Sequence, residues 1–175
     1  MRAARTADGD RAPSLALVSA MVAVPILVID QSTKIMIRSL LPPCGPWNCD
    51  GLHAGPLAII NETNTGSAFS FRPGSSLWIV LAMASVLLVP VVGNKLRTAA
   101  PPRWSLSLAL GLVAGGALGN LTDRLLYGGV TDFLVPGAYV SFNVADMAAI
   151  TGVAMTIGLL VRYRAGLVAG RGSTI

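Results

Sequence analysis

Apolar residues are gathered into four long runs that polar stretches separate. The runs cover residues 13–29, 76–93, 104–121 and 147–161. Each is roughly 15 to 20 residues long, which is close to the length that an α-helix needs to cross the hydrocarbon layer of a membrane. The pattern therefore predicts an α-helical integral membrane protein with four transmembrane helices.

The composition agrees with this prediction, because 53% of the 175 residues are hydrophobic and only 12% are charged. The net charge of +5 would suggest nucleic acid as a partner in a soluble protein. Here the basic residues lie between the apolar runs, so they are better explained as a topology signal, and we expect no nucleic-acid partner.

The basic residues predict the orientation of the chain. Nine of the thirteen Lys and Arg residues fall on one side: Arg2, Arg5, Arg11, Lys95, Arg97, Arg103, Arg162, Arg164 and Arg171. The positive-inside rule places that side in the cytoplasm, with regions 31–75 and 122–145 outside. We expect cytoplasmic tails at 1–12 and 163–175 around a membrane domain at 13–162. A cleavable signal peptide is the alternative for the first run, but no small-x-small cleavage site follows it closely.

The first outer loop, 41–75, is predicted to contain a small extracytoplasmic β-sheet. Its segment 56–72 alternates polar and apolar residues and is rich in β-branched and aromatic ones. Cys44 and Cys49 lie in the same loop, where an oxidising compartment permits a disulfide, but the spacing equally allows free thiols. His53 is interpreted as a surface residue.

Glycines recur at four-residue spacing in the third run, at Gly111, Gly115 and Gly119. One face of the predicted helix is therefore nearly bare backbone. We interpret this face as a surface for close helix packing.

Ionisable residues at the ends of the apolar runs are candidates for function, because such residues in membrane proteins usually face the interior and mark a site. Asp30 and Lys34 are one helical turn apart, which allows an ion pair. Asp123 and Arg124 end the third run and form another candidate pair. Asp146 opens the fourth run.

Several kinds of active site have no motif in this chain. It contains no H-E-x-x-H pair, no G-x-S-x-G elbow and no glycine-rich phosphate loop, and it has a single histidine. No metal or organic cofactor is indicated. What remains is a pair of aspartates, Asp132 and Asp146.

Two carboxyl groups close together in a site of low dielectric cannot both ionise cheaply, so they share one proton. The charged carboxylate then acts as a base toward water and the neutral one as an acid. The helix macrodipole favours an anion at Asp146, so we expect Asp132 to carry the shared proton.

Four motifs in order resemble the lipoprotein signal peptidase family, also called signal peptidase II. They are Asp30-Gln-Ser-Thr-Lys34, Asn64-Thr-Gly-Ser-Ala-Phe69, Gly119-Asn-Leu-Thr-Asp-Arg124 with Val130-Thr-Asp-Phe133, and Phe142-Asn-Val-Ala-Asp146. The resemblance covers residues 14–162. It implies a monomeric aspartic endopeptidase of the bacterial inner membrane that removes signal peptides from diacylglyceryl-modified prolipoproteins.

The resemblance also implies roles for individual residues. Asp132 and Asp146 match the catalytic pair. Positions that match those holding substrate, or the cyclic peptide inhibitor globomycin, are Asn64, Gly66, Asn120, Arg124 and Asn143. Asp30, Lys34 and Asp123 match structural polar positions. Lys34 is a possible ion-pair partner of Asp30, and Arg124 is a possible partner of Asp123. The segment between Asp132 and the last motif is short compared with many relatives.

Two other classes remain as alternatives. A small transporter or channel would spread Asp30, Asp123, Asp132 and Asp146 along an ion path through the membrane. A membrane scaffold without catalytic function would explain the glycine face but not the carboxylates. Membrane lipids are expected partners under each of these interpretations.

Overall fold

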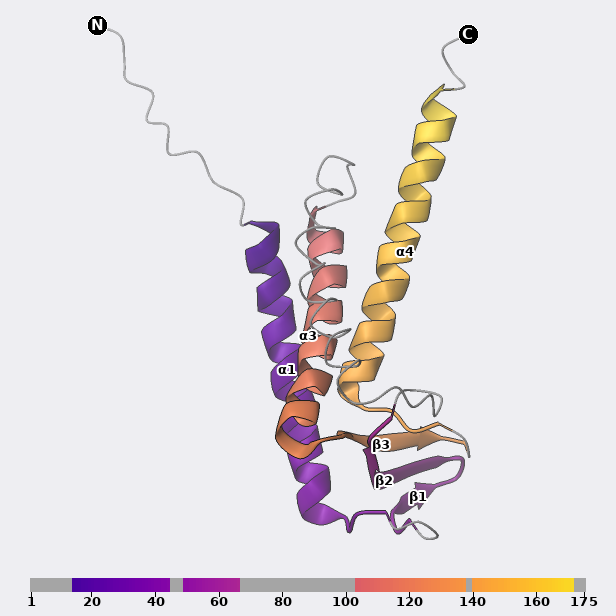
Figure 1. Cartoon of the computed structure of the whole chain (residues 1–175). Helices are drawn as coiled ribbons and strands as arrows, with labels where there is room; N and C mark the ends of the chain where they lie inside the picture. The colour runs from indigo at the N-terminus through magenta and orange to yellow at the C-terminus, as the bar shows by residue number, and fades with distance from the viewer. Residues whose placement is uncertain (1–13, 45–48, 67–102, 138–139, 172–175) are drawn as a thin grey trace, which may run out of the picture.

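The computed structural model describes residues 14–44, 49–66, 103–137 and 140–171 (Figure 1). The elements are α1 (Leu15–Leu40), β1 (Leu52–Ala54), β2 (Leu57–Asn64), α3 (Arg103–Tyr127), β3 (Val130–Pro136) and α4 (Val144–Arg171). The predicted apolar run 76–93 lies outside the described residues, as do Lys95 and Arg97.

Within the described ranges, three helices are long and apolar enough to cross a membrane: Leu15–Leu40, Trp104–Tyr127 and Val144–Arg162. Large apolar side chains face outward along them, such as Leu17, Met21, Val24 and Val28 on α1. A soluble protein would bury such a surface, whereas lipid covers it at no cost. The membrane prediction is therefore confirmed for these three helices.

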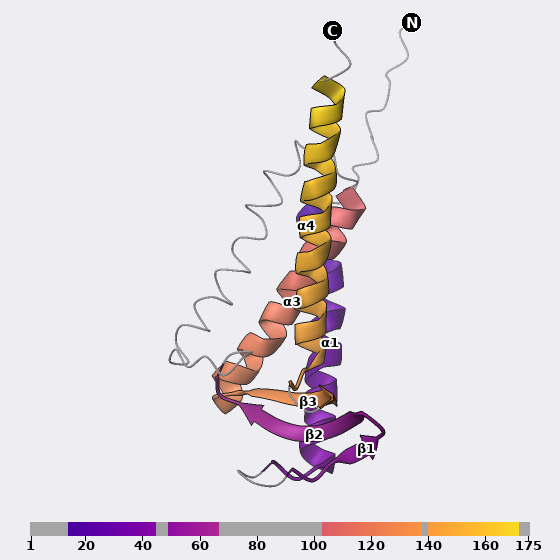
Figure 2. The same cartoon turned by 90° about the vertical axis from the view of Figure 1, so that its right-hand side faces the viewer.

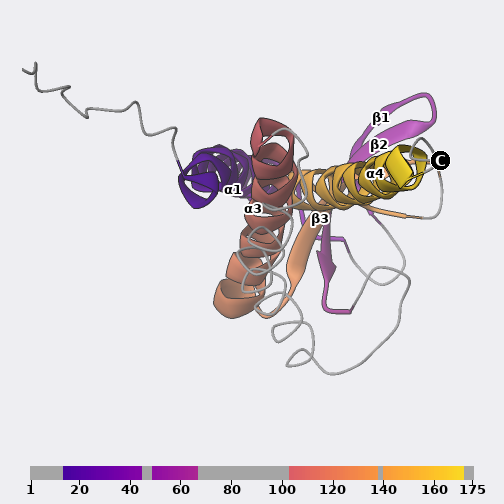
Figure 3. The ribbon, with the colours of Figure 1, turned by 90° about the horizontal axis from the view of Figure 1, so that it is seen from above.

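The helix α3 lies between α1 and α4, as the view from above shows (Figure 3). A side chain at Gly111 would collide with Val22 of α1, and one at Gly115 would collide with Ile26. The predicted packing face is confirmed, because these glycines allow the two helices to approach closely.

The described helices extend beyond the apolar runs. The first continues from residue 29 to Leu40, so the segment between the first apolar run and the outer loop predicted at 41–75 is helical. No glycine or proline interrupts residues 26–41, and the buried Asp30 and Lys34 face other protein groups. The last helix runs to Arg171, through most of the segment expected to be a tail.

The sheet has three antiparallel strands in the order β1-β2-β3 (Figure 2). A small sheet was predicted in the first outer loop, around segment 56–72, and the described part of that segment, up to Gly66, contains the strand β2. The partners of β2 come from either side of that segment: β1 precedes it and β3 comes from the loop before α4. Local alternation does not reveal the β3 pairing, because its partner is more than 60 residues away in the chain.

The sheet lies at the end of the helix bundle where α1 and α3 end and α4 begins (Figure 1). The strand β3 is an edge strand of the sheet. It follows α3 and precedes α4 in the chain. This arrangement brings the last two sequence motifs to one end of the bundle.

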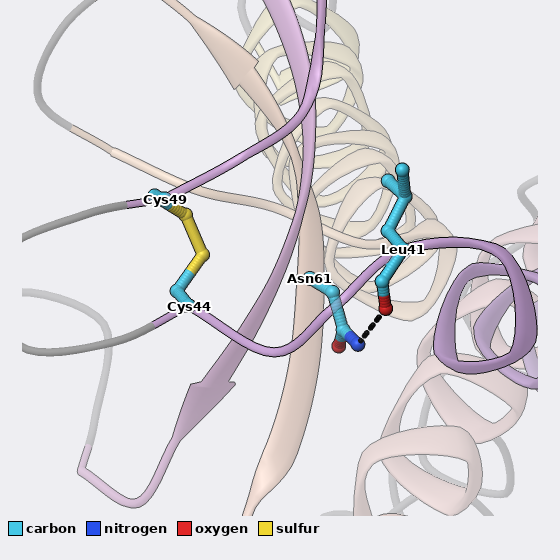
Figure 4. Close-up of a disulfide and its surroundings, with 4 residues drawn as sticks. All are labelled: Leu41, Cys44, Cys49 and Asn61. Carbon is cyan, nitrogen blue, oxygen red and sulfur yellow. Dashed lines mark hydrogen bonds between the residues drawn. A yellow bond between two sulfur atoms is a disulfide. The ribbon is translucent and has the colours of Figure 1, made fainter.

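Cys44 and Cys49 form a disulfide, which resolves the alternatives left open by the sequence (Figure 4). The backbone N–H of Cys44 donates to the carbonyl of Asn61 in β2, at 2.8 Å. The side chain of Asn61 donates in turn to the carbonyl of Leu41, at 2.9 Å. The chain leaving α1 is thus attached to the middle strand.

We predict that replacing both cysteines by serine lowers the free energy of unfolding by about 2 kcal/mol, the chain-entropy contribution of so short a loop. The measurement is thermal unfolding in detergent. Reductant should destabilise the unaltered protein by a similar amount and leave the double variant unchanged. Equal sensitivity of the two proteins to reductant would contradict the prediction.

We also predict that Gly115→Ala destabilises the bundle by about 1 to 3 kcal/mol, because the added methyl overpacks the helix contact. The new Cβ would lie 2.8 Å from the carbonyl oxygen of Ala23. Gly158→Ala on α4 is the matched control, since nothing described lies within 4 Å of its Cβ position. Thermal unfolding of both variants should show a loss only for the first.

Candidate functional site

The two predicted aspartates come from different elements and line one cavity. Asp132 is the third residue of β3, and Asp146 lies in the first turn of α4. The cavity has a volume of about 200 Å³, and its other polar side chains include Asn64, Asn120 and Arg124. The structure therefore brings together residues that are far apart in the sequence, as the motifs predicted.

The remainder of the cavity wall is mainly apolar. It is formed by Val130, Val140, Phe142, Ala149 and Ile150, with Ser141 beside them. Carboxyl groups thus face an apolar space at the sheet end of the bundle. Such a cavity suits a ligand with apolar groups better than a wholly hydrophilic one.

Two asparagine amides connect the carboxyl groups. Asn143 donates its amide N–H₂ both to Asp132 Oδ1, at 2.6 Å, and to Asn120 Oδ1, at 3.1 Å. Asn120 donates its own amide to Asp146 Oδ1, at 2.7 Å. The two carboxyl groups are therefore held by one continuous set of hydrogen bonds, and displacement of either would disturb the other.

Asp146 is fixed by the way its helix begins. The side chain of Asn143 accepts from the N–H of Asp146, at 2.8 Å, and Asp146 Oδ2 accepts from the N–H of Asn143, at 3.2 Å. This reciprocal pair is a capping box, in which each residue satisfies a free N–H of the first helical turn. The carboxylate is therefore held at the helix N-terminus, where the macrodipole favours negative charge.

Asp132 is held from the sheet by Asn64. The Asn64 amide donates to Asp132 Oδ2, at 2.9 Å. The side-chain oxygen of Asn64 accepts from the backbone N–H of Gly66, at 3.0 Å, which fixes the amide orientation. Gly66 thus reaches the site through Asn64 and contributes its backbone.

The pKa of Asp132 is raised to about 6. Burial is the largest cause, because only 2% of the residue is exposed, and the nearby charge of Asp146 adds to it. Hydrogen bonds from Asn64 and Asn143, and the charge of Lys34, oppose the rise. The buried Asp132 carboxyl group therefore keeps its proton to a higher pH than an exposed aspartate does.

A network of buried ions lies behind the cavity. Lys34 Nζ is 2.8 Å from Asp30 Oδ2, which confirms the predicted pair, and it is 3.4 Å from Asp123 Oδ2. Lys34 also donates to Asn120 Oδ1, at 2.9 Å. Asp30 Oδ1 accepts from the N–H of Ala145, at 2.9 Å, and so ties α1 to the first turn of α4.

The predicted pairing of Asp123 with Arg124 is wrong. Consecutive side chains on a helix point in different directions, so the two groups face different surroundings. Asp123 faces α1, where it pairs with Lys34 and with Arg38. Arg124 lines the cavity, and its Nη1 donates to the carbonyl of Asn120 at 3.2 Å.

Sequence reasoning missed three residues of this network: Gln31, Arg38 and Thr131. The amide of Gln31 donates to Asp30 Oδ2, at 3.1 Å, and to Asp123 Oδ1, at 3.2 Å. Arg38 follows Asp30 and Lys34 at another four-residue step, so one face of a longer helix would have indicated it. Thr131 had no signal apart from its place beside Asp132.

Among the residues that the structure describes, no three His, Cys, Asp or Glu side chains are grouped as metal ligands would be. His53 is exposed on β1, where it lines a separate, open hollow on the sheet. The polar side chains that line the candidate cavity carry carboxyl groups, amides, one hydroxyl and the guanidinium of Arg124.

The fold and the site together define a helical membrane protein with a carboxylate pair at one end of its bundle. Residues 22–162 match the family model described as Signal peptidase (SPase) II. The chain is 33% identical over 171 residues to the lipoprotein signal peptidase of Mycobacterium avium (strain 104), covering 89% of this chain and 85% of that protein. It is 37% identical over 128 residues to that of Syntrophomonas wolfei, covering 73% and 81%.

Two solved structures of bacterial membrane enzymes are similar to this chain. One described as a bacterial membrane enzyme structure by the in meso method matches with a TM-score of 0.69 and 25% identity, over 83% of this chain and 88% of that one. A second of the same description has a TM-score of 0.66, with 26% identity, over 81% and 91%. The chain belongs to the signal peptidase II family, the lipoprotein signal peptidases, which are proteases.

The raised pKa of Asp132 predicts a pH-dependent stability. The folded protein holds this proton more tightly than the unfolded chain, so the stabilisation is complete below pH 3.8 and is lost as the pH rises through about 6. The loss is on the order of 3 kcal/mol. In thermal unfolding between pH 4 and 7, the unaltered protein should lose stability relative to Asp132→Asn. Parallel curves for the two proteins would show the pKa to be normal.

Proposed function

We propose that this protein is an aspartic endopeptidase that removes the signal peptide from diacylglyceryl-modified prolipoproteins, cutting before the lipidated cysteine. The observation that carries the proposal is the single cavity lined by Asp132 and Asp146, whose carboxyl groups are joined through Asn120 and Asn143. Family membership supplies the substrate class.

In the proposed reaction, Asp146 is the charged carboxylate and Asp132 holds the proton. Asp146 takes a proton from water as the water oxygen adds to the scissile carbonyl carbon, and Asp132 gives its proton to the carbonyl oxygen. The resulting tetrahedral diol returns a proton to Asp132 as its carbonyl re-forms. Asp146 gives its proton to the leaving nitrogen, and the C–N bond breaks.

The surroundings of the pair suit these roles. Asp146 lies at the positive end of the α4 dipole and accepts from Asn120, both of which favour its charged form. Asp132 is more deeply buried, which favours its neutral form. Arg124 and Asn64 line the cavity and are proposed to hold the substrate backbone, and globomycin-type inhibitors are proposed to occupy the same space.

The position of the site supports cleavage at the outer face of the bacterial cytoplasmic membrane. The start of α1, the start of α3 and the end of α4 lie on the side of the molecule opposite the sheet, and the end of α4 extends furthest from it (Figure 1). Arg103 and Arg162 belong to that distant end, which the positive-inside rule places in the cytoplasm. An apolar signal helix and two acyl chains can then remain in lipid while the bond enters the cavity.

A transporter is disfavoured by the distribution of charge. The buried ionisable residues Asp30, Lys34, Asp123 and Asp132 are gathered at the sheet end of the described bundle instead of marking a path through it.

One chain supplies both carboxyl groups and the amides that join them, and we therefore propose that the monomer is active.

The proposal predicts that Asp132→Asn and Asp146→Asn each lower cleavage by at least about 10³-fold, since neither variant can share and transfer the proton. The assay follows release of the signal peptide from a diacylglyceryl-modified prolipoprotein by purified protein in detergent. Asp50→Asn is the control, because Asp50 is an exposed carboxylate in the first outer loop. Cleavage by either dyad variant at the unaltered rate would rule out the dyad mechanism.

A further inference from the structure

Thr131, the residue before Asp132, lies opposite Thr63 of β2 and is held at two further points. Its backbone N–H donates to Asp123 Oδ2, at 2.8 Å, and its hydroxyl oxygen accepts from Arg38 Nε, also at 2.8 Å. Thr131 is buried. Because β3 is an edge strand of the sheet, only one of its sides pairs with β2. At Thr131 the other side is held by groups from α1 and α3, while further along the strand Phe133 and Leu134 form backbone hydrogen bonds with Phe142.

Arg38 closes this arrangement. Its Nη2 lies 2.8 Å from Asp123 Oδ1, as an ion pair that is not aligned for a hydrogen bond, and its guanidinium carbon lies 3.9 Å from the centre of the Tyr127 ring. The planar group therefore has an aromatic face on one side and an acidic partner on another. We name the three residues Arg38, Asp123 and Thr131 the threonine clamp.

Arg38 is not among the residues that line the cavity, so it acts on the candidate site through its partners. One partner is Thr131 on β3, and the other is Asp123, which also pairs with Lys34. The side chain of Asp132 is directed by the backbone at its own position and by hydrogen bonds from Asn64 and Asn143. Those amides hold the carboxyl group at its tip, whereas the clamp holds the strand from which it projects. A shift of that strand would move the carboxyl group relative to Asp146.

We propose that Arg38 is a positioning residue for Asp132. By fixing Thr131 at the edge of the sheet, Arg38 holds the Asp132 carboxyl group in its position relative to Asp146. This inference rests on the proposed catalytic role of Asp132. A displacement of a reacting group by about 1 Å can cost about 10²-fold in rate, even when the mutated residue is remote from the chemistry. The clamp is thus expected to affect turnover more than substrate binding.

The surrounding contacts separate this role from simple stabilisation. Asp123 retains Lys34 and Gln31 as partners when Arg38 is removed. The helices α1 and α3 remain joined along the glycine face and through the pair of Asp30 with Lys34. Loss of Arg38 therefore leaves the bundle packed while it releases one of the two contacts that hold Thr131 from outside the sheet.

The test compares Arg38→Met, Thr131→Val and the double variant in the prolipoprotein cleavage assay. Each single variant should lower kcat by about 10- to 100-fold with KM changed less than about twofold. The double variant should be no slower than the slower single one, because both substitutions remove the same contact. Thr131→Ser, unlike Thr131→Val, keeps the hydroxyl group that accepts from Arg38, and it should keep most of the activity.

Two controls make the outcome decisive. Arg162→Met removes an exposed arginine from the far end of α4 and should leave kcat unchanged. Thermal unfolding is measured for every variant, and Thr131→Val keeps the N–H contact to Asp123 if Arg38→Met proves unstable. Multiplicative losses in the double variant, or an unchanged kcat in Thr131→Val, would overturn the positioning role alone. Absence of cleavage by the unaltered protein would overturn the proposed function as well.

Discussion

The ammonium group of Lys34 is the buried charge on which the rest of the structure depends. Its side chain is 0% exposed, and it contacts Asp30, Asn120 and Asp123 within 3.4 Å. An unpaired cation at such a position would be very unfavourable, and breaking a buried ion pair is strongly destabilising. The contacts of Lys34 therefore specify how α1 packs against α3, and Asn120 connects this requirement to the carboxyl pair.

The arrangement links stability to the site through shared groups. Asn120 accepts from Lys34 and donates to Asp146, while Asp30 accepts from Lys34 and from the first turn of α4. The helix that carries Asp146 is thus placed by charges that do not enter the cavity. Contacts of this kind support the residues that line the cavity from behind. They keep two reactive groups within the narrow range of distance and orientation that catalysis requires.

Much of the site was predictable from residue patterns, and the failures have physical causes. The Asp30 and Lys34 pair was found because both residues lie on one helix face, where spacing alone decides contact. Arg38 was missed because the apolar run ends near residue 29, although buried polar contacts extend the helix to Leu40. The pairing of Asp123 was mistaken because nearness in sequence is a poor guide to which element a helical side chain faces.

The sequence by itself determined that the chain is a membrane protein and where the apolar parts of its three described helices lie. Its motifs named the carboxylates and asparagines of the candidate site, because apolar length and motif order are local properties. The tertiary structure alone decided that β3 pairs with β2, that Asn143 joins both carboxyl groups, and that Arg38 and Asp123 meet at Thr131. Those contacts join residues that are distant along the chain. Their partners are chosen by burial and geometry, which no local pattern records.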